Sequence, residues 1–454
     1  MKLWLDVDDL FFFARHSARL TGIQRLTGEI YKALAPKGSD RVGFLVHDDG
    51  PEGFREVDWP TVLATYESLT GTTRPAQPEP ASLSASDAGQ NDAGTGAGRT
   101  FGSVLRRLFL EDDRAASERL QQPTPDEPPA PRPGPVRKPG DALCSLGAPW
   151  HDEKYADRVL RFTRPVEMRF GMLVHDLIPL LCPEFFELGR APNFAPFMTD
   201  VLPLADVLMT NSQSTARDVV RWSRREGVSL KAEPHHLPIG TGFARPSAGP
   251  LPTGLAPGSF VLFVSTIEIR KNHLQAFRVW NRLLQDMPRD RVPTLVFAGT
   301  PGWMVSDLMK AIESTNQLDG KLVMIQGPDD ATLCALYQAC QFTLFLSHYE
   351  GWGLPITDSL SFGKVCVAAN RTSLPEAGGT SCIYVDPDDT TGAYKTIRRL
   401  IEDPTMLAEL ERRLASSFVQ VPWSVTADAV LESIFPHDRR SGWMVTTDYA
   451  VAKT

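Results

Sequence analysis

The chain has 454 residues, a formal net charge of −8 and a hydrophobic share of 42%. This length allows two domains of ordinary size, and the negative charge argues against general binding to nucleic acid or to an anionic membrane. The longest apolar runs, such as FVLFV, are too short to span a bilayer.

The N-terminus and the cysteines predict a cytoplasmic protein. MKLWLDVDDL carries acids where a signal peptide needs an unbroken apolar region. The six cysteines are scattered and form no Cys-x-x-Cys pair. We therefore expect reduced thiols and not a disulfide framework or a zinc site.

Apolar runs alternate with amphipathic segments along the chain. Residues 2–7, KLWLDV, are typical of a buried parallel strand, and TGIQRLTGEIYKALAP has apolar residues at helical spacing before Pro36 ends it. This repetition predicts an α/β protein whose parallel sheets are covered by helices. Further strands are predicted in MRFGMLV, ADVLMT, SFVLFV, PTLVFAG, KLVMI, FTLFLS and KVCVA.

The Pro/Gly-rich segments predict the domain boundaries. An N-terminal domain of residues 1–243 contains a low-complexity insertion at 71–140. A Pro/Gly linker at 244–259 leads to a second domain at 260–422. In the final segment, 423–454, PWSVTADAVLESIF is predicted to form a helix that crosses back to the first domain.

The insertion combines two segments of predicted disorder with one predicted helix. Residues 71–100 and 121–140 are rich in Pro, Gly, Ala and Ser, and lack the apolar content that offsets ordering entropy. Residues 101–120 have apolar positions at helical spacing beside Arg106 and Arg107. This helix would bind a membrane surface or a partner, or dock on its own domain.

Two acids flank a glycine-rich turn in HYEGWGLPITDSLSFG, residues 348–363. The preceding FTLFLS is a predicted buried strand, so the turn lies at a carboxyl strand end, where open α/β sheets bind ligands. Gly351 and Gly353 let backbone N–H groups approach an anion, toward which the next helix directs its positive end. The carboxylates of Glu350 and Asp358 can accept hydrogen bonds from sugar and ribose diols. The alternatives are a tight turn for the glycines and helix-dipole stabilisation for Asp358.

EGWGLPITDSLSFG resembles the E-x7-E segment of retaining glycosyltransferases of family four (glycosyl transferases group 1), which have the GT-B fold. The resemblance covers nearly the whole chain except residues 70–140 and the end of the tail. It implies two Rossmann-like domains whose parallel sheets face each other across a cleft. The donor-domain pattern is found in VSTIEIRKNH, LVFAGTPGW, KLVMIQGPDDATLCALY, FLSHYEGWGLP and VAANRTSLPEAGG, and a bacterial polysaccharide-assembly branch is indicated by TGIQRLTGEI, LCSLGAPW, VHDLIPLLCPEFF and VLMTNSQSTARDV.

The resemblance implies roles for the residues of this segment. Glu350 would hold hydroxyls of the transferred sugar, and Asp358 would hold the nucleotide ribose. The family's second acid is Glu, so the shorter Asp358 would draw the ribose inward or reach it through water. Donor-binding roles also follow for Gly351, Trp352, Gly353 and Leu354.

A nucleotide-sugar enzyme must stabilise a departing diphosphate. No convincing Asp-x-Asp metal site lies at a strand end, and DVDD at 6–9 is the nearest candidate. The resemblance implies fixed cations in place of a metal, which assigns Lys271 and Arg270 to the diphosphate. The family's more usual arginine position holds Thr266, so Arg270 would take over that role. An Arg-Lys pair on a solvated loop is the alternative.

The first domain contributes further candidates. His175 ends the MRFGMLV strand and, by the resemblance, would face the donor sugar; a structural pair with Asp176 is the alternative. In TGIQR, Gly22 would allow close backbone approach and Arg25 would contact a phosphate or the acceptor. A helix capped by Thr21 and a surface Arg25 is the alternative. The donor-binding set also includes Gly299, which with Gly302 and Trp303 would shape the base pocket, and Glu376, near the sugar or phosphate.

The resemblance implies a retaining, metal-independent hexosyltransferase with a nucleotide diphosphate sugar as co-substrate and no cofactor. The resemblance implies front-face attack, in which the leaving phosphate takes the acceptor proton, so that the protein needs domain closure but no nucleophile. We expect mannose from GDP-mannose, or glucose from UDP-glucose, to be transferred to a lipid-linked precursor of a cell-surface polysaccharide such as exopolysaccharide or lipopolysaccharide.

Other functions remain open at this point. A non-catalytic GT-B protein could bind a nucleotide sugar or glycan within an assembly complex, and a nucleotide-sugar epimerase can share the fold. Peripheral association with the inner face of the cell membrane is a further hypothesis. It depends on Arg221, Arg224, Arg225 and Lys231 near Trp222, for which a solvated helix end is the alternative.

Overall fold

A computed structural model describes residues 1–454 except 18–19, 71–133, 188, 190–192, 243–248 and 437–454. The predicted helix at 101–120 and most of the predicted disorder therefore lie outside the described residues. Residues 134–140, also predicted to be disordered, are described. Arg137 there forms a 2.5 Å ion pair with Glu52 and donates a 2.7 Å hydrogen bond to the carbonyl of Phe162. The prediction is wrong for this short stretch, because Arg137 has fixed partners despite the surrounding prolines.

The first half of the chain builds a seven-stranded sheet in the order β3-β2-β1-β4-β5-β6-β7. Its pairings are parallel except that β3 runs antiparallel to β2. Both faces of the central strands are buried, which explains why KLWLDV is apolar without alternation. The strands are β1 (Leu3–Asp6), β2 (Val42–His47), β3 (Phe54–Val57), β4 (Ala142–Ser145), β5 (Arg169–Val174), β6 (Val207–Thr210) and β7 (His235–His236).

Helices cover both faces of this sheet. Leu3 and Leu5 share a core with α1, α2 and α3 on one face, whereas Trp4 packs with α5, α7 and α8 on the other. Successive strand side chains point to opposite faces, so one strand contributes to both cores. The helices are α1 (Asp8–His16), α2 (Gly22–Leu34), α3 (Trp59–Thr70), α5 (Tyr155–Thr163), α6 (Ile178–Leu181), α7 (Phe194–Val201) and α8 (Gln213–Glu226).

The second half builds a six-stranded parallel sheet in the order β10-β9-β8-β11-β12-β13. It is also covered on both faces, with α12 on one side and α9 and α15 on the other. The strands are β8 (Phe260–Val264), β9 (Thr294–Ala298), β10 (Leu322–Ile325), β11 (Thr343–Phe345), β12 (Cys366–Ala369) and β13 (Cys382–Val385). The helices are α9 (His273–Asp286), α10 (Ser306–Ser314), α11 (Asn316–Gly320), α12 (Asp330–Ala339), α13 (Leu354–Ser361), α14 (Leu374–Gly378), α15 (Thr390–Glu402) and α16 (Pro404–Ser417).

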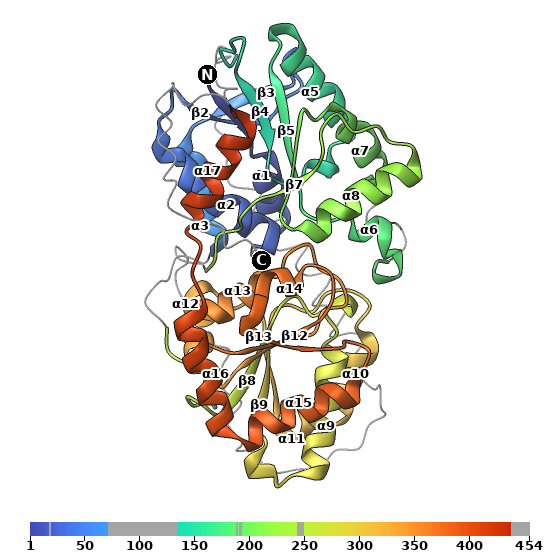
Figure 1. Cartoon of the computed structure of the whole chain (residues 1–454), viewed down its shortest axis with the longest axis vertical. Coiled ribbons are helices and arrows are strands. Elements are labelled where there is room, and N and C mark those ends of the chain that lie inside the picture. The colour runs from blue at the N-terminus through green and yellow to red at the C-terminus, as the bar shows by residue number, and fades with distance from the viewer. Residues whose placement is uncertain (18–19, 71–133, 188, 190–192, 243–248, 437–454) are drawn as a thin grey trace, which may run out of the picture.

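The two sheets form two lobes along the long axis of the molecule, and the last described helix returns from the second lobe to the first (Figure 1). This helix, α17 (Trp423–Ile434), packs against α2 and contributes Val430, Leu431 and Ile434 to the core of the first lobe. Among the described residues, no helix combines the length and apolar character needed to cross a membrane.

The contact of α17 with the first lobe predicts a stability effect. Ile434 is fully buried, and its Cδ1 lies so close to β5 that a Cβ added to Gly171 would approach it to 2.2 Å. Ile434→Ala should destabilise the first lobe by about 2–5 kcal/mol, because it leaves a cavity between α17 and the sheet. Calorimetric unfolding should show a lower melting temperature. The matched control is Glu432→Ala, an exposed position on the same helix, which should cost less than about 0.5 kcal/mol; equal effects would contradict this packing role.

Candidate active site

Two cations and one carboxylate meet at the carboxyl edge of the second sheet. Lys271 ends a short turn of 3-10 helix after β8, and Glu350 lies in the loop between β11 and α13. Lys271 Nζ lies 2.5 Å, and Arg270 Nη1 2.9 Å, from the same oxygen, Glu350 Oε1. Lys271 and Glu350 are 79 positions apart in the sequence. They meet because the loops that carry them follow β8 and β11, which are neighbouring strands of the sheet.

The two cations keep Glu350 ionised in a nearly buried place. Burial by itself raises the pKa of Glu350, but the charges of Arg270 and Lys271 outweigh it and lower the pKa to about 2. Burial, and then the neighbouring Arg270, lower the pKa of Lys271 below its usual value. A further anion, such as a diphosphate, would therefore find a favourable place beside Lys271.

Glu268 completes this cluster and was not identified from the sequence. It is 1% exposed, and its Oε1 lies 2.5 Å from Arg270 Nη2. Arg270 also donates a 2.6 Å hydrogen bond to the carbonyl of Tyr349. The guanidinium is thus held between two acids and one carbonyl, where it positions Glu350. Of the two predicted cations, Lys271 lines the cavity between the lobes and Arg270 does not. In the sequence, the indication of Glu268 was an acid two positions before Arg270 in TIEIRKNH.

A cavity of about 300 Å³ lies between the lobes beside Lys271 and Glu350. This volume is at the lower end of what small-molecule sites occupy. Among the residues that line it, Trp352 carries a buried indole N–H without a hydrogen-bond partner in the described part of the chain. Of the other predicted site residues, those lining the cavity are Gly22, Arg25, His175, Gly299, Gly351, Gly353, Leu354 and Asp358.

Two glycines of the EGWGLP loop are required by the backbone around them. A Cβ at Gly351 would lie 2.0 Å from the carbonyl oxygen of His175, so the lobes approach too closely there for any side chain. Gly353 precedes α13 with a φ of +133°, a conformation that favours glycine. The loop thus brings the start of α13 to the cavity, which Leu354 and Pro355 line.

His175 reaches the cavity from the first lobe as a neutral imidazole. Its Nε2 lies 2.8 Å from the carbonyl oxygen of Leu146 and therefore donates to it. Burial lowers the pKa of His175 to about 4. The alternative pairing with Asp176 is not observed, since the Asp176 carboxylate accepts from the backbone N–H of Ile178. With Nε2 protonated, Nδ1 is left as a hydrogen-bond acceptor for a ligand hydroxyl.

Asp358 is paired with a cation of the first lobe. Arg25 Nη1 lies 3.8 Å from Asp358 Oδ2, and Arg25 Nη2 lies 2.5 Å from Asp330 Oδ1. Asp358 is 4% exposed, and burial raises its pKa to about 7, an effect that the charge of Arg25 opposes. Arg25 is therefore not the surface residue of the alternative prediction; it lines the cavity and joins the lobes at the predicted ribose position.

Glu376 does not line the cavity, which corrects its predicted place near the sugar or phosphate. Its carboxylate accepts hydrogen bonds of 2.7 and 2.8 Å from the backbone N–H groups of Gln213 and Ser214. These are the first residues of α8, where a carboxylate satisfies unpaired helix donors. Glu376 thus links the second lobe to the first.

Two other expectations also change. Trp303, predicted near the base, donates a hydrogen bond to the carbonyl of Phe185 in the first lobe. Trp222 is 3% exposed and lies in the core, so it cannot be part of the predicted membrane-binding surface.

Residues 256–417 match the family model of glycosyl transferases group 1. This match covers the second lobe from β8 to α16. Two curated mannosyltransferases of Escherichia coli are similar to the chain. Serotype-specific mannosyltransferase WbdA is 27% identical over 266 residues, which are 57% of this chain and 32% of WbdA. O-antigen chain mannosyltransferase B is 28% identical over 261 residues, 55% of this chain and 65% of that protein. The match thus spans about a third of WbdA and just under two thirds of the second relative.

Solved structures confirm the predicted GT-B fold. The Anabaena protein Alr3699/HepE, crystallised with UDP and glucose, superposes with a TM-score of 0.57 at 15% identity, covering 96% of this chain and 99% of its own. Sucrose-phosphate synthase from Thermosynechococcus elongatus superposes with a TM-score of 0.55 at 14% identity, covering 95% and 98%.

The depressed pKa of Glu350 predicts a pH-dependent stability. Its folded pKa of about 2 lies below the ordinary value of 4.5, so the ion pairs contribute full stability above about pH 5 and lose it as the pH falls toward 2. Glu350→Gln removes the carboxylate that Lys271 and Arg270 share, and leaves Arg270 with Glu268 alone. It should cost about 3–5 kcal/mol at pH 7. The melting temperature of Glu350→Gln should lie below that of the unchanged protein, and this difference should become smaller as the pH is lowered from 5 to 3.

The control for this measurement is Glu402→Gln, which removes an exposed pair with Arg398. Because exposed pairs contribute little, its melting temperature should stay close to that of the unchanged protein at both pH values. A Glu350→Gln difference that does not change with pH would show that the carboxylate charge does not stabilise the cluster.

Proposed function

We propose that the protein is a glycosyltransferase that moves a hexose from a nucleotide diphosphate sugar to a glycan acceptor. The observation that supports this most directly is the joint position of Lys271 and Glu350, 2.5 Å apart on an interlobe cavity in a glycosyl transferases group 1 domain. A cation for the diphosphate and a carboxylate for sugar hydroxyls are the two groups that such a donor needs side by side.

The proposed reaction retains the anomeric configuration and needs no metal at the diphosphate. Lys271 stabilises the charge that develops on the leaving phosphate, while Arg270 and Glu268 hold Glu350 in place against the sugar. His175 Nδ1 accepts from a hydroxyl near the reacting carbon. The leaving phosphate oxygen takes the proton of the acceptor hydroxyl as the new glycosidic bond forms on the same face, so catalysis consists of positioning and electrostatics.

The proposed donor is GDP-mannose, with UDP-glucose as the second candidate. Mannose is favoured because both E. coli relatives are named mannosyltransferases and one of them acts on the O-antigen chain. The proposed acceptor is a lipid-linked precursor of a cell-surface polysaccharide. The ribose would lie at Asp358, where its hydroxyls would compete with Arg25 for the carboxylate.

A non-catalytic protein that binds a nucleotide sugar in an assembly complex is the second candidate. The observation that favours this function is that Glu350 is ion-paired with Lys271, and Asp358 with Arg25. Both carboxylates thus have protein partners of their own at the positions where the donor hydroxyls would bind. A donor that binds tightly but is neither hydrolysed nor transferred to any acceptor would support this function over the first.

Substitution of Lys271 tests the proposed catalytic site. Lys271→Ala should lower the rate of GDP release from GDP-mannose, measured with a coupled assay, by at least about a hundredfold. The fold should persist, because Arg270 still neutralises Glu350. Addition of Mg²⁺ should not raise the rate of the unchanged protein.

The matched control is Lys310→Ala, an exposed lysine of α10 outside the cavity, which should leave GDP release unchanged. Equal rates for Lys271→Ala and the unchanged protein would remove Lys271 from the site.

Peripheral membrane association is retained as a proposal, now without Trp222. Arg224 and Arg225 are exposed at the end of α8, although Arg225 contacts Glu226 at 2.7 Å. If these arginines meet anionic lipid, the protein should co-sediment with phosphatidylglycerol vesicles in 50 mM salt, and Arg224→Gln with Arg225→Gln should abolish this binding. Phosphatidylcholine vesicles are the control, and co-sedimentation equal for both lipids or both proteins would dismiss the idea.

A further inference from the structure

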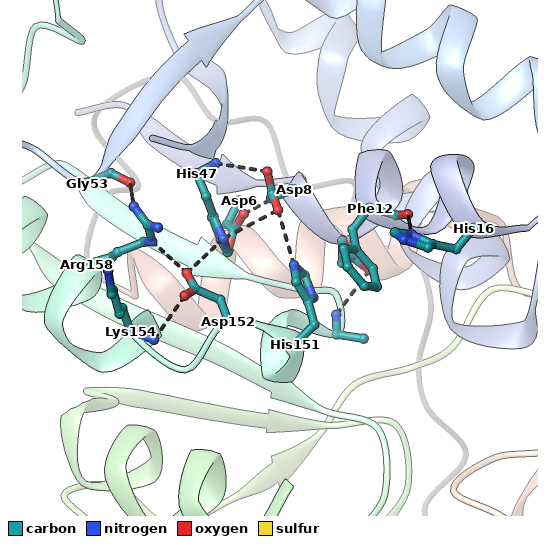
Figure 2. A network of polar contacts seen from close by, with 12 residues as sticks. Asp6, Asp8, Phe12, His16, His47, Gly53, His151, Asp152, Lys154 and Arg158 are labelled. Carbon is teal, nitrogen blue, oxygen red and sulfur yellow. Dashed lines mark hydrogen bonds and ion pairs between the residues drawn. The ribbon is translucent and has the colours of Figure 1, made fainter. Parts of the chain in front are cut away.

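A second cluster of polar side chains lies in the first lobe, outside the donor cavity. Figure 2 shows Asp8, His47 and His151 with their side chains turned toward one another. Asp8 begins α1 directly after β1, His47 ends β2, and His151 ends the 3-10 turn Pro149–His151 that follows β4. Because β2, β1 and β4 are neighbours in the sheet, their carboxyl ends bring these residues together.

The distances in this cluster match those between ligands of one metal ion. Asp8 Oδ2 lies 3.3 Å from His151 Nε2 and 3.4 Å from His47 Nδ1, and the three ligand atoms all lie within 4.8 Å of one another. Around an ion bonded to nitrogen and oxygen at about 2.1 Å, neighbouring corners of a tetrahedron are about 3.4 Å apart. Two of the three separations thus match those of neighbouring ligands of one ion.

The surrounding acids orient His47 for this role. Its Nε2 lies 3.2 Å from Asp6 Oδ2, which is almost fully buried, so Nε2 donates to that carboxylate while Nδ1 faces Asp8 and Asp152. A carboxylate on the far nitrogen is the usual support of a metal-binding histidine. Asp152 Oδ2 lies 3.0 Å from His47 Nδ1 and is itself fixed by Arg158 Nε at 2.6 Å (Figure 2).

The cluster attracts positive charge. Three carboxylates, those of Asp6, Asp8 and Asp152, lie within 3.4 Å of a ring nitrogen of His47. A divalent cation bound at Nδ1 would offset this negative charge.

We propose that Asp8, His47 and His151 bind one divalent transition-metal ion, of which Zn²⁺ is the best match. Two imidazoles and one carboxylate suit Zn²⁺, Co²⁺ and Fe²⁺ better than Mg²⁺ or Ca²⁺, which prefer oxygen ligands alone. Three protein ligands leave the fourth position for water or a ligand, and His151 and Asp8 are 18% and 17% exposed at that side.

This site is separate from the proposed transfer site, since none of its three ligands lines the donor cavity. An ion there would tie the start of α1 to the end of β2 and to the turn after β4. On the exposed side, Phe12 stacks on His151 with ring centroids 4.0 Å apart. The ion would therefore stabilise the edge of the first lobe without touching the diphosphate.

The full chain, freed of metal with a chelator and dialysed, should bind one Zn²⁺ per molecule, measured by calorimetric titration and by the metal content after gel filtration. Co²⁺ should give visible absorption bands that Zn²⁺ removes by displacement, and either ion should raise the melting temperature. His151→Gln and Asp8→Asn should each weaken binding at least about tenfold and abolish these bands.

The matched control is His236→Gln, an exposed histidine of β7 in the same lobe, which should bind Zn²⁺ as the unchanged chain does. Circular dichroism and the melting temperature of the metal-free variants separate loss of a ligand from loss of fold. If the unchanged chain binds Zn²⁺ no more tightly than His151→Gln, the cluster holds only the proton of His47 and the proposal is wrong.

Discussion

The contact of Lys271 and Arg270 with one oxygen of Glu350 is the interaction on which the rest of the candidate site depends. It joins the loops after β8 and β11, two neighbouring strands of the second sheet, and it keeps a nearly buried carboxylate ionised. Glu268 forms a second ion pair with Arg270 and holds it in place, whereas Lys271 lines the cavity. A preorganised charge of this kind costs no rearrangement when a diphosphate departs.

The cavity exists because the lobes meet along several specific contacts. Gly351 lies against the carbonyl of His175, the carboxylate of Glu376 satisfies the first N–H groups of α8, and Arg25 reaches across to Asp358. Each contact joins an element of one lobe to an element of the other. A nucleotide sugar that binds here must share or replace some of them, which couples donor binding to the separation of the lobes.

The same geometric rule produces the cluster of Asp8, His47 and His151. Parallel strands gather the residues that follow them at one edge, so distant segments supply polar side chains to a common place. In the second lobe this edge collects cations and an acid suited to a diphosphate sugar. In the first lobe it collects imidazoles and carboxylates, which suit a transition-metal ion. The two sets lie in different lobes and would act independently.

The sequence by itself determined the alternation of strand and helix, the GT-B fold through its resemblance, and the residues at the strand ends, because hydrophobic periodicity and turn residues are local properties. Among the residues that it singled out, Lys271, Glu350 and the EGWGLP glycines line one cavity. Partners distant in sequence were decided only by the tertiary structure. The way in which the lobes meet decides that Arg25 pairs with Asp358 and that Glu376 accepts from the first N–H groups of α8. The order of strands in the first sheet brings His47 close to Asp8 and His151. Spacing along the chain does not encode these distances, since long-range packing sets them.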